Sequence, residues 1–315
     1  MSEFLRYCCL PNMDLQSSIT NRKVLILGAS GFIGQQILDD WGELAIGTHF
    51  SKPSPRTVYF DVLSTDLNSI EGVSGCSHAV ILFGETNPDR CFKDPAHARA
   101  LNVEGTARVI DQCRNLGITP VFASSEAVFS GSRGLYEETD VPDPILFYGE
   151  LKAKIESYLL RTCESFLLLR FARVVGVRDN DRSLFTSWLK QIESGHDQII
   201  CARDQWMSII SIMDLSNLLK LLILAKSNGM FHLSDGLRHN RLDLLKHFVC
   251  RAKPANRAIH IKEVSIDYFQ CPEVRPRDTS LASCKVRNMF HYEFRSIESC
   301  IDDVLKNCRG RPSDT

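Results

Sequence analysis

The chain has 315 residues, of which 44% are hydrophobic and 24% charged, and its formal net charge is −1. This length is enough for one large α/β domain with a smaller lobe, and the composition is that of an ordinary globular protein. The charge is balanced and no long basic stripe occurs, so we expect no nucleic-acid partner. No run of 18 apolar residues is present, so we expect no membrane span.

The twelve cysteines are scattered, and only Cys8 and Cys9 are adjacent. Because no CxxC pair or Cys/His cluster has the spacing of zinc ligands, the sequence predicts no metal site. Reduced, mostly buried thiols are the simpler interpretation, which favours a cytoplasmic protein. Residues 1–21 do not have the pattern of a secretory signal and are predicted to be an N-terminal tail, within which Met13 is an alternative start. Residues 309–315 are predicted to be a C-terminal tail.

Short apolar strands alternate with helices from residue 23 onward. The strands are predicted at residues 23–27, 44–48, 58–60, 79–83, 120–123 and 166–171, and the helices at 33–41, 95–116 and 147–163. Such alternation is typical of βαβ units and of a parallel sheet. We therefore predict an α/β fold, with a Rossmann-type doubly wound parallel sheet forming a dinucleotide-binding domain over residues 22–176.

The pattern becomes looser after residue 176. Helices are predicted at residues 183–193, 212–226 and 242–251, strands at 198–201 and 229–233, and a loop rich in Pro and Arg at 271–280. We predict that residues 177–308 form mainly a smaller C-terminal substrate-binding lobe. Segments at about 209–233 are expected to return to the first domain, so that the chain crosses between the two parts more than once.

The first predicted strand is followed by the sequence GASGFIG. Its first glycine permits the tight turn, its second lets backbone N–H groups approach a pyrophosphate, and its third lets the following helix pack on the sheet. A purely structural glycine turn is the less favoured alternative. The cofactor-binding residues predicted here are Gly28, Ser30, Gly31, Phe32, Ile33 and Gly34.

The end of the second strand indicates which dinucleotide is bound. An acidic residue there binds the ribose 2′-hydroxyl, whereas a basic residue accommodates a 2′-phosphate. Residues 47–52, Gly-Thr-His-Phe-Ser-Lys, contain no acid, and Arg56 lies nearby. We therefore predict contacts from His49, Ser51 and Lys52 and favour NADP(H), with NAD(H) as the alternative. Lys52 alone fits a solvated loop nearly as well.

Tyr148 and Lys152 lie four residues apart on a predicted helix, so both side chains can reach one site. A serine pair, Ser124 and Ser125, follows a predicted strand at the edge of the sheet where ligands bind. Reduction of a ketone needs a proton donor, and a nearby ammonium lowers the tyrosine pKa from about 10. One unit charge at about 4 Å contributes roughly 4 kcal/mol at an effective dielectric constant of 20. A serine hydroxyl can polarise the carbonyl. The alternative is an aromatic–basic pair on a helix surface.

The spacing GxxGxxG, the segment ASSEAVFSG and the motif YGELK together resemble the extended short-chain dehydrogenase/reductase family over nearly the whole chain. The resemblance implies that Ser125, rather than Ser124, joins Tyr148 and Lys152 in catalysis, because it precedes the Val-aromatic pair by three residues. Phe83-Gly84 departs from the alanine-rich pair that is usual after the fourth strand. The further cofactor-binding residues that the resemblance implies are Asp61, Val62, Phe83, Gly84 and Asn102, with Tyr148 and Lys152.

Within this family the chain looks most similar to dTDP-4-dehydrorhamnose reductases and related nucleotide-sugar reductases. The late sequence RPRD implies that Arg275 and Asp278 bind the substrate, with the arginine fork suited to its diphosphate. Ser125 and Glu126 are the other substrate contacts implied. A solvated loop is the alternative for the RPRD segment. Ile209 departs from the proline that these reductases usually have.

The resemblance implies an NADPH-dependent reductase acting on a keto group of a nucleotide-linked sugar. Dehydratase chemistry is not expected, because Ala127 stands where a base would be needed. A nucleotide-sugar epimerase is an alternative. A second is an NADP-binding regulatory subunit without turnover, such as the β subunit of methionine adenosyltransferase. The sequence permits a homodimer but determines neither the oligomeric state nor the sugar.

Overall fold

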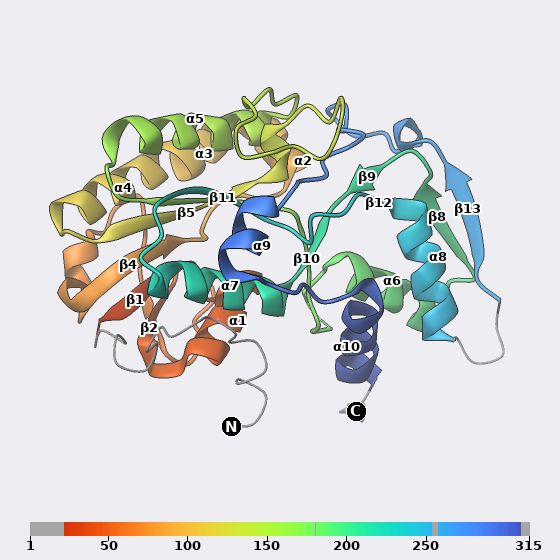
Figure 1. Cartoon of the computed structure of the whole chain (residues 1–315), viewed down its shortest axis with the longest axis horizontal. Coiled ribbons are helices and arrows are strands. Elements are labelled where there is room, and N and C mark those ends of the chain that lie inside the picture. Colours follow the sequence, from red (N-terminus) through yellow and green to blue (C-terminus); the bar gives the residue numbers. More distant parts are fainter. Residues whose placement is uncertain (1–21, 180, 254–257, 310–315) are drawn as a thin grey trace.

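A seven-stranded parallel sheet runs through the molecule, with helices on both of its faces (Figure 1). This computed structural model describes residues 22–179, 181–253 and 258–309. The strand order is β11-β6-β5-β4-β1-β2-β3, and every neighbouring pair is parallel. The strands are β1 (Lys23–Leu27), β2 (Ala45–His49), β3 (Thr57–Tyr59), β4 (Cys76–Ile81), β5 (Thr119–Ser125), β6 (Leu167–Phe171) and β11 (Gly229–Leu233). The predicted α/β fold with a Rossmann-type parallel sheet is confirmed.

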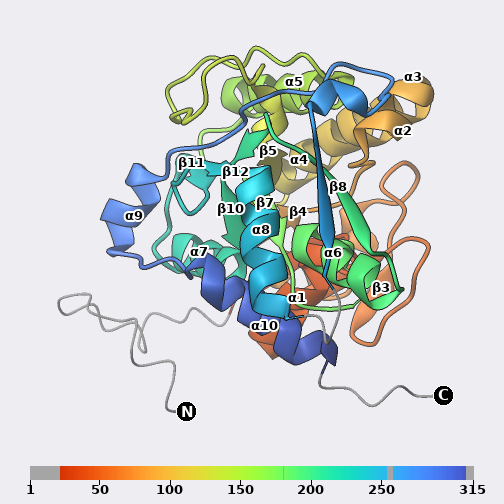
Figure 2. The same ribbon diagram turned by 90° about the vertical axis from the view of Figure 1, so that its right-hand side faces the viewer.

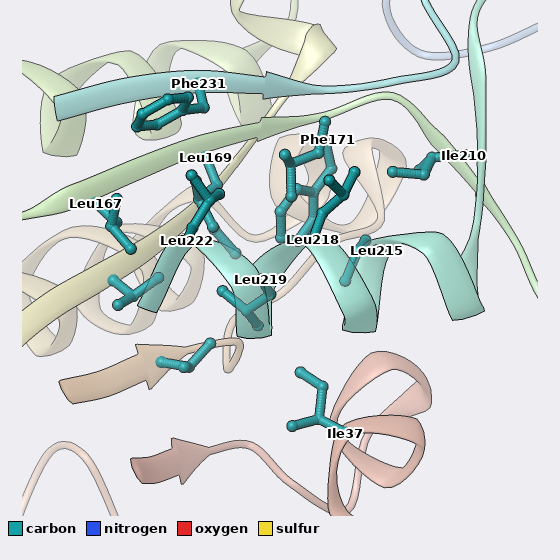
Figure 3. Close-up of a cluster of buried hydrophobic side chains, with 14 of the residues drawn as sticks. Ile37, Leu167, Leu169, Phe171, Ile210, Leu215, Leu218, Leu219, Leu222 and Phe231 are labelled. Carbon is teal, nitrogen blue, oxygen red and sulfur yellow. The ribbon is translucent and has the colours of Figure 1, made fainter. Parts of the chain in front are cut away.

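Two apolar layers cover the sheet because its side chains alternate between faces. In β1, Val24 and Ile26 face the layer that contains α1 (Phe32–Trp41) and α7 (Ile212–Leu224). Leu25 and Leu27 face the opposite layer, which contains α4 (Thr106–Asn115) and α5 (Phe147–Thr162). Figure 3 shows the sheet-facing side of α7, whose leucines recur at helical spacing. Those labelled leucines are Leu215, Leu218, Leu219 and Leu222.

The single helix predicted at residues 95–116 is divided in the structure. It consists of α3 (Pro95–Arg99), a π-helical stretch at Ala100–Gly105, and α4. A further helix, α2 (Pro88–Lys93), precedes it. The Asn87 side chain accepts a 3.1 Å hydrogen bond from the Arg90 N–H, and Pro88 occupies the first turn. Both are ordinary signals for the start of a helix, so the sequence does contain the information that predicts α2.

A smaller lobe lies on the right of Figure 1 and faces the viewer in Figure 2. A separate apolar cluster joins four of its elements to each other. These are α6 (Leu184–Glu193), β8 (Gln198–Ala202), α8 (Arg241–Ala252) and α10 (Ile297–Arg309). β8 pairs with β13 (His260–Val264), a strand that the sequence pattern did not predict.

Two short strand pairs connect the lobe with the large sheet. β7 (Arg173–Val175) pairs with β10 (Ile209–Ser211), and β9 (Trp206–Met207) pairs with β12 (His239–Asn240). The chain then returns to the main sheet as β11, beside β6, and later forms α9 (Cys284–Phe290).

The predicted tails fall mostly outside the described residues. Residues 1–21 and 310–315 are not described, whereas α10 continues through Arg309. Among the helices that are described, none combines the length and the apolar character needed to cross a membrane.

Candidate functional site

The glycine loop between β1 and α1 is shaped by close backbone approaches. Gly28 has a φ of +87°, and a Cβ there would lie 2.8 Å from the Phe83 backbone nitrogen. A Cβ at Gly34 would lie 2.5 Å from the Ala29 Cα, where the helix packs against the loop. Both distances are shorter than real Cβ contacts, so larger residues would displace the loop from the sheet. These two positions therefore require glycine for the reasons that the motif predicts.

The N-terminus of α1 is available to an anion. Gly31 precedes the helix in extended conformation and, having no side chain, does not cap the first-turn N–H groups. Phe32 and Ile33 begin the helix, while the Ser30 carbonyl accepts a 3.0 Å hydrogen bond from the Gln35 side chain. Uncapped amides and the helix dipole suit a pyrophosphate, so this loop fits a dinucleotide.

The last residues of β2 are structural, whereas those that follow the strand are exposed. The Thr48 hydroxyl is buried and accepts a 3.2 Å hydrogen bond from the Gly28 N–H, so it fixes the glycine loop. The His49 ring nitrogen lies 2.8 Å from the Thr57 hydroxyl. Ser51 and Lys52 are exposed.

Arg56, which the sequence places near the same site, is already engaged by α1. Its guanidinium donates 2.9 Å hydrogen bonds to the Leu38 carbonyl and to the Asp39 carboxylate. Asp39 also binds Arg178, from the segment that follows β7, at 2.6 Å. Ser51 and Lys52 are therefore the better candidates for a 2′-phosphate contact.

The loop after β4 is held by Asn102 in the π-helical stretch. Asn102 accepts a 2.9 Å hydrogen bond from the Glu85 N–H and donates one of 2.8 Å to the Glu85 carbonyl. Gly84 has a φ of +140°, and a Cβ there would lie 2.7 Å from the Asn102 side-chain oxygen. Phe83-Gly84 stands where the resembled family usually has an alanine-rich pair. This difference has a structural reason, because Gly84 allows the close contact with Asn102.

Asp61 and Val62 follow β3 at the same edge of the sheet. The Asp61 carboxylate accepts hydrogen bonds of 3.0 Å from the Leu63 N–H and 2.7 Å from the Ser64 hydroxyl. Val62 is buried, with its methyl groups close to Gly105. The contacts described for both residues are with other parts of the protein, so these contacts alone do not identify a bound ligand.

Ser125, Tyr148 and Lys152 come together from β5 and α5. The Ser125 hydroxyl hydrogen-bonds to the Tyr148 phenol and accepts a 3.2 Å bond from the Ala127 N–H. The Lys152 ammonium donates a 2.7 Å hydrogen bond to the Ala123 carbonyl. It also lies 5.8 Å from the centre of the Tyr148 ring. The three predicted catalytic side chains therefore share one site at the carboxyl end of the sheet.

Burial dominates the ionisation of this group. It raises the pKa of Tyr148, the negative charge of Glu126 raises it further, and the Ser125 hydrogen bond opposes the shift. Burial lowers the pKa of Lys152 to about 8, against the opposing charge of Glu156. Lys152 is thus a group whose charge changes near neutral pH, as expected for a residue that assists proton transfer.

A buried ionic network lies directly behind the catalytic group, and the sequence analysis did not identify it. Glu156 binds Arg170 at 2.7 Å, and their side chains are 2% and 1% exposed. The Ser124 hydroxyl donates a 2.5 Å hydrogen bond to Glu156, and Arg170 lies 3.4 Å from the His232 ring nitrogen. Burial lowers the pKa of His232 to about 3, so it is neutral. Ser124 is committed to this network, whereas Ser125 faces Tyr148.

Glu126 lies on the other side of Ser125. Its carboxylate accepts a 2.9 Å hydrogen bond from the Ser125 hydroxyl and lies 3.9 Å from the Arg173 guanidinium. Arg173 begins β7, two residues after Phe171, which is the β6 residue paired with Ser125. Glu126 was predicted from the sequence as a substrate contact, but Arg173 was not, because only the pairing of β5 with β6 brings Arg173 to the site.

The RPRD segment has several internal partners. Arg275 donates a 2.5 Å hydrogen bond to Asp89 in α2, and its other terminal nitrogen has no partner among the described residues. Asp278 is buried, binds Arg238, and accepts a 2.6 Å hydrogen bond from the Ser280 hydroxyl. These contacts are sufficient to explain Asp278 as a structural residue.

The same late segment also supports the catalytic helix. Glu273 accepts a 2.7 Å hydrogen bond from the Phe147 N–H, at the first residue of α5. The residue that precedes α5 makes no side-chain cap, so the lobe supplies the acceptor that the helix start needs. The position of Tyr148 therefore depends on both parts of the molecule.

The chain is similar to methionine adenosyltransferase 2 subunit beta of Bos taurus, at 27% identity over 170 residues, 52% of this chain and 50% of that protein. It thus spans about half the length of that relative. It also matches a probable low-salt glycan biosynthesis reductase of Haloferax volcanii at 25% identity, covering 67% and 73% of the two chains.

Solved structures share the fold. A hypothetical dTDP-4-dehydrorhamnose reductase from Sulfolobus tokodaii superposes with a TM-score of 0.75 at 22% identity, covering 88% of this chain and 98% of that one. A dTDP-4-dehydrorhamnose reductase from Bacillus anthracis, solved in complex with NADP, gives 0.74 at 21% identity, covering 91% and 99%. Residues 22–309 match the family described as RmlD substrate binding domain. Since this match extends over most of the sequence, the chain belongs to the RmlD substrate binding domain family.

Proposed function

We propose that the protein is an NADPH-dependent reductase of a keto group on a nucleotide-linked sugar. The observation that carries this proposal is the meeting of Ser125, Tyr148 and Lys152 at the carboxyl end of the sheet, the same edge from which the glycine loop leaves β1. Tyr148 donates the proton to the carbonyl oxygen, Ser125 orients and polarises the carbonyl, and Lys152 supports the tyrosine electrostatically. The fold shared with solved dTDP-4-dehydrorhamnose reductases supports the same assignment.

The bound cofactor supplies the hydride, and the chain's own residues select it. Gly28–Gly34 and the N-terminus of α1 would hold the pyrophosphate, and Asp61 would contact the adenine. NADP(H) is favoured because residues 47–52 contain no acid and Lys52 is exposed there. NAD(H) is the alternative, since solved proteins of this fold include complexes with NADP and with NAD. Titration of the apo protein with both cofactors decides between them.

Substrate contacts are proposed for Ser125, Glu126, Arg275 and Asp278. Ser125 and Glu126 already share a hydrogen bond at the catalytic end of the sheet. One terminal nitrogen of Arg275 is buried and has no partner among the described residues, so it has hydrogen-bonding capacity left for the substrate's diphosphate. Asp278 is the weakest member of this set, because Arg238 and Ser280 already satisfy its carboxylate.

The test is consumption of NADPH, followed by its absorbance, with dTDP-linked and UDP-linked 4-keto sugars. We expect turnover with at least one of them and none when the keto group has been reduced beforehand. Binding of NADPH without oxidation by any keto-sugar nucleotide would contradict the reductase assignment.

A regulatory role is the second candidate, and the curated relatives favour it. Methionine adenosyltransferase 2 beta subunits from several vertebrates match the chain at 25–28% identity. In this case the protein would bind the dinucleotide and alter the activity of a catalytic partner. Addition of the purified protein to a methionine adenosyltransferase from the same source tests this role, through a change in its KM for methionine.

A further inference from the structure

The helix that carries Tyr148 begins without a cap from its own chain neighbours. Leu146 precedes α5 and has no polar side chain, so the first N–H groups of the helix find no acceptor within it. The Phe147 N–H donates a 2.7 Å hydrogen bond to Glu273 instead. A carboxylate also suits the positive end of the helix dipole. Glu273 therefore caps the catalytic helix from a segment far along the chain.

The start of α5 fixes the place of Tyr148, which is the second residue of the helix. Tyr148 belongs to a small buried cluster together with Ala127 and Leu146. A Cβ added to Gly149 would overlap the Ala127 carbonyl oxygen, so the first turn of α5 lies directly against the segment that follows Ser125. Because no side chain separates the two, a shift of this turn changes the distance between Tyr148 and Ser125.

Arg275, two residues after Glu273, connects the same segment to a second helix beside Tyr148. Its guanidinium donates a 2.5 Å hydrogen bond to Asp89 in α2. Cys91, also in α2, is fully buried in the cluster that contains Tyr148. The segment that carries Glu273 and Arg275 thus holds two of the helices that pack around the catalytic tyrosine.

This segment is stiff, and the protein does not satisfy all of its polar atoms. Pro272 and Pro276 flank it, and each proline restricts its own backbone and that of the residue before it. One carboxylate oxygen of Glu273 and one terminal nitrogen of Arg275 are buried without a partner among the described residues. Such atoms cost free energy until they are paired. A diphosphate bound at Arg275 would pair the nitrogen and would restrain Glu273, two residues away.

We propose that Glu273 is a positioning residue, which holds the start of α5 and with it Tyr148, most firmly when the substrate's diphosphate is bound at Arg275. Glu273 acts through the helix and takes no part in proton transfer. The inference rests on the proposed function and deepens it. Recognition of the nucleotide end of the substrate then contributes to kcat as well as to affinity, because binding energy far from the reacting carbonyl is used to orient the proton donor.

The first experiment is steady-state kinetics with the keto-sugar nucleotide that wild type reduces. We expect Glu273→Ala to lower kcat by about 10- to 100-fold, the effect of a small misplacement of the proton donor. KM and NADPH affinity should stay close to those of wild type. Glu273→Gln keeps an acceptor oxygen for the Phe147 N–H and should retain most of kcat. Glu150→Gln removes an exposed acid from the first turn of α5 and should behave as wild type, which separates the hydrogen bond from the helix charge.

The second experiment follows hydrogen exchange of the Phe147 amide by NMR in the NADP⁺ complex. UDP or dTDP is added, whichever binds in calorimetry, and it should slow this exchange in wild type by about tenfold. In Glu273→Ala the amide should exchange faster, and the nucleotide should bind without slowing it. Thermal melting identifies a variant that fails to fold, in which case Glu273→Asp, which keeps the charge but shortens the side chain, takes the place of Glu273→Ala.

Either of two results would overturn the inference while the proposed function stands. One is a kcat that is the same in Glu273→Ala and wild type. The other is a Phe147 exchange rate in wild type that the bound nucleotide does not change, as expected for a cap with only a structural role. Failure of wild type to bind either nucleoside diphosphate or to reduce any keto-sugar nucleotide would instead remove the proposed function, and this inference with it.

Discussion

Tyr148 is buried beside Ser125 and Lys152. In the proposed mechanism its hydroxyl donates a proton to the carbonyl oxygen of the substrate. Replacement by Phe removes that hydroxyl and leaves the ring that packs against neighbouring side chains. We expect Tyr148→Phe to lower turnover by about 10²- to 10⁴-fold, the contribution of a positioned acid. NADPH affinity should stay close to that of wild type. Steady-state rates and a NADPH titration check both parts, and unchanged turnover would favour the regulatory role.

Lys152 carries a charge in a buried place, which costs stability. Its pKa falls from 10.5 in an unfolded chain to about 8 in the fold. Below pH 8 both states are protonated, and the folded state bears a penalty of about 3 kcal/mol. Between pH 8 and 10.5 the unfolded chain binds more protons, so stability rises with pH. We expect Lys152→Met to melt at a higher temperature than wild type at pH 7, with the difference shrinking toward pH 10.5.

The measurement is the thermal unfolding of wild type and of Lys152→Met between pH 7 and pH 10.5, followed by circular dichroism. Lys154→Met, on a more exposed side of α5, serves as the control and should show no such pH dependence. A wild type that is more stable than Lys152→Met at pH 7 would show that the 2.7 Å bond to the Ala123 carbonyl outweighs the cost of burying the charge.

Local motifs account for most of what could be predicted from the sequence at this scale. The glycine loop and the Tyr148–Lys152 spacing each depend on residues a few positions apart, so a linear pattern reveals them. Arg173 and Glu273 reach the site only through strand pairing and lobe docking. Such partners come from distant segments, and a single sequence without relatives carries no signal for that proximity.

Consecutive residues at the end of β5 each contact a different side chain on one face of α5. Three consecutive strand residues, 123–125, bind Lys152, Glu156 and Tyr148 respectively. These helix residues are spaced by four, so they lie on one face of α5. The series fixes the rotation of the helix relative to the strand, and with it the direction of the catalytic hydroxyls.

Glu156 is the member of this series whose loss should be most damaging. Glu156→Gln would leave the Arg170 guanidinium buried without its carboxylate, which typically destabilises a protein by about 3–5 kcal/mol. The double variant Glu156→Gln/Arg170→Met removes both charges and should recover much of that loss. Urea denaturation of wild type, of Glu156→Gln and of the double variant tests this. Equal stability of Glu156→Gln and wild type would contradict it.

The lobe and the sheet domain meet at the RPRD segment, so Arg275 acts at the scale of the whole molecule. It binds Asp89 in the sheet domain with one terminal nitrogen and has the other without a described partner. Loss of one charge-assisted contact costs about 1.5–3 kcal/mol, or roughly 10- to 150-fold in affinity. We therefore expect Arg275→Ala to weaken inhibition by a nucleoside diphosphate by this factor. NADPH binding should be unchanged, because the contact described for Arg275 is with Asp89 in α2 and not with the glycine loop.

Competition assays with UDP and dTDP give the measurement, and Arg277→Ala is the matched control. Arg277 lies two residues away but pairs with Asp204 and Asp267 within the lobe. Equal inhibition of wild type and Arg275→Ala would remove the diphosphate role of Arg275.

The position of β11 at the end of the central sheet has a consequence for biosynthesis. Residues 229–233 complete the sheet beside β6, so a nascent chain that has emerged only through β6 presents an unpaired strand edge. The leucine face of α7 is also absent at that stage, which leaves one apolar layer uncovered. The ribosome must therefore release more than 230 residues before the first half can close. Assembly is late and non-local, and chains that stall within the lobe are those most prone to aggregate.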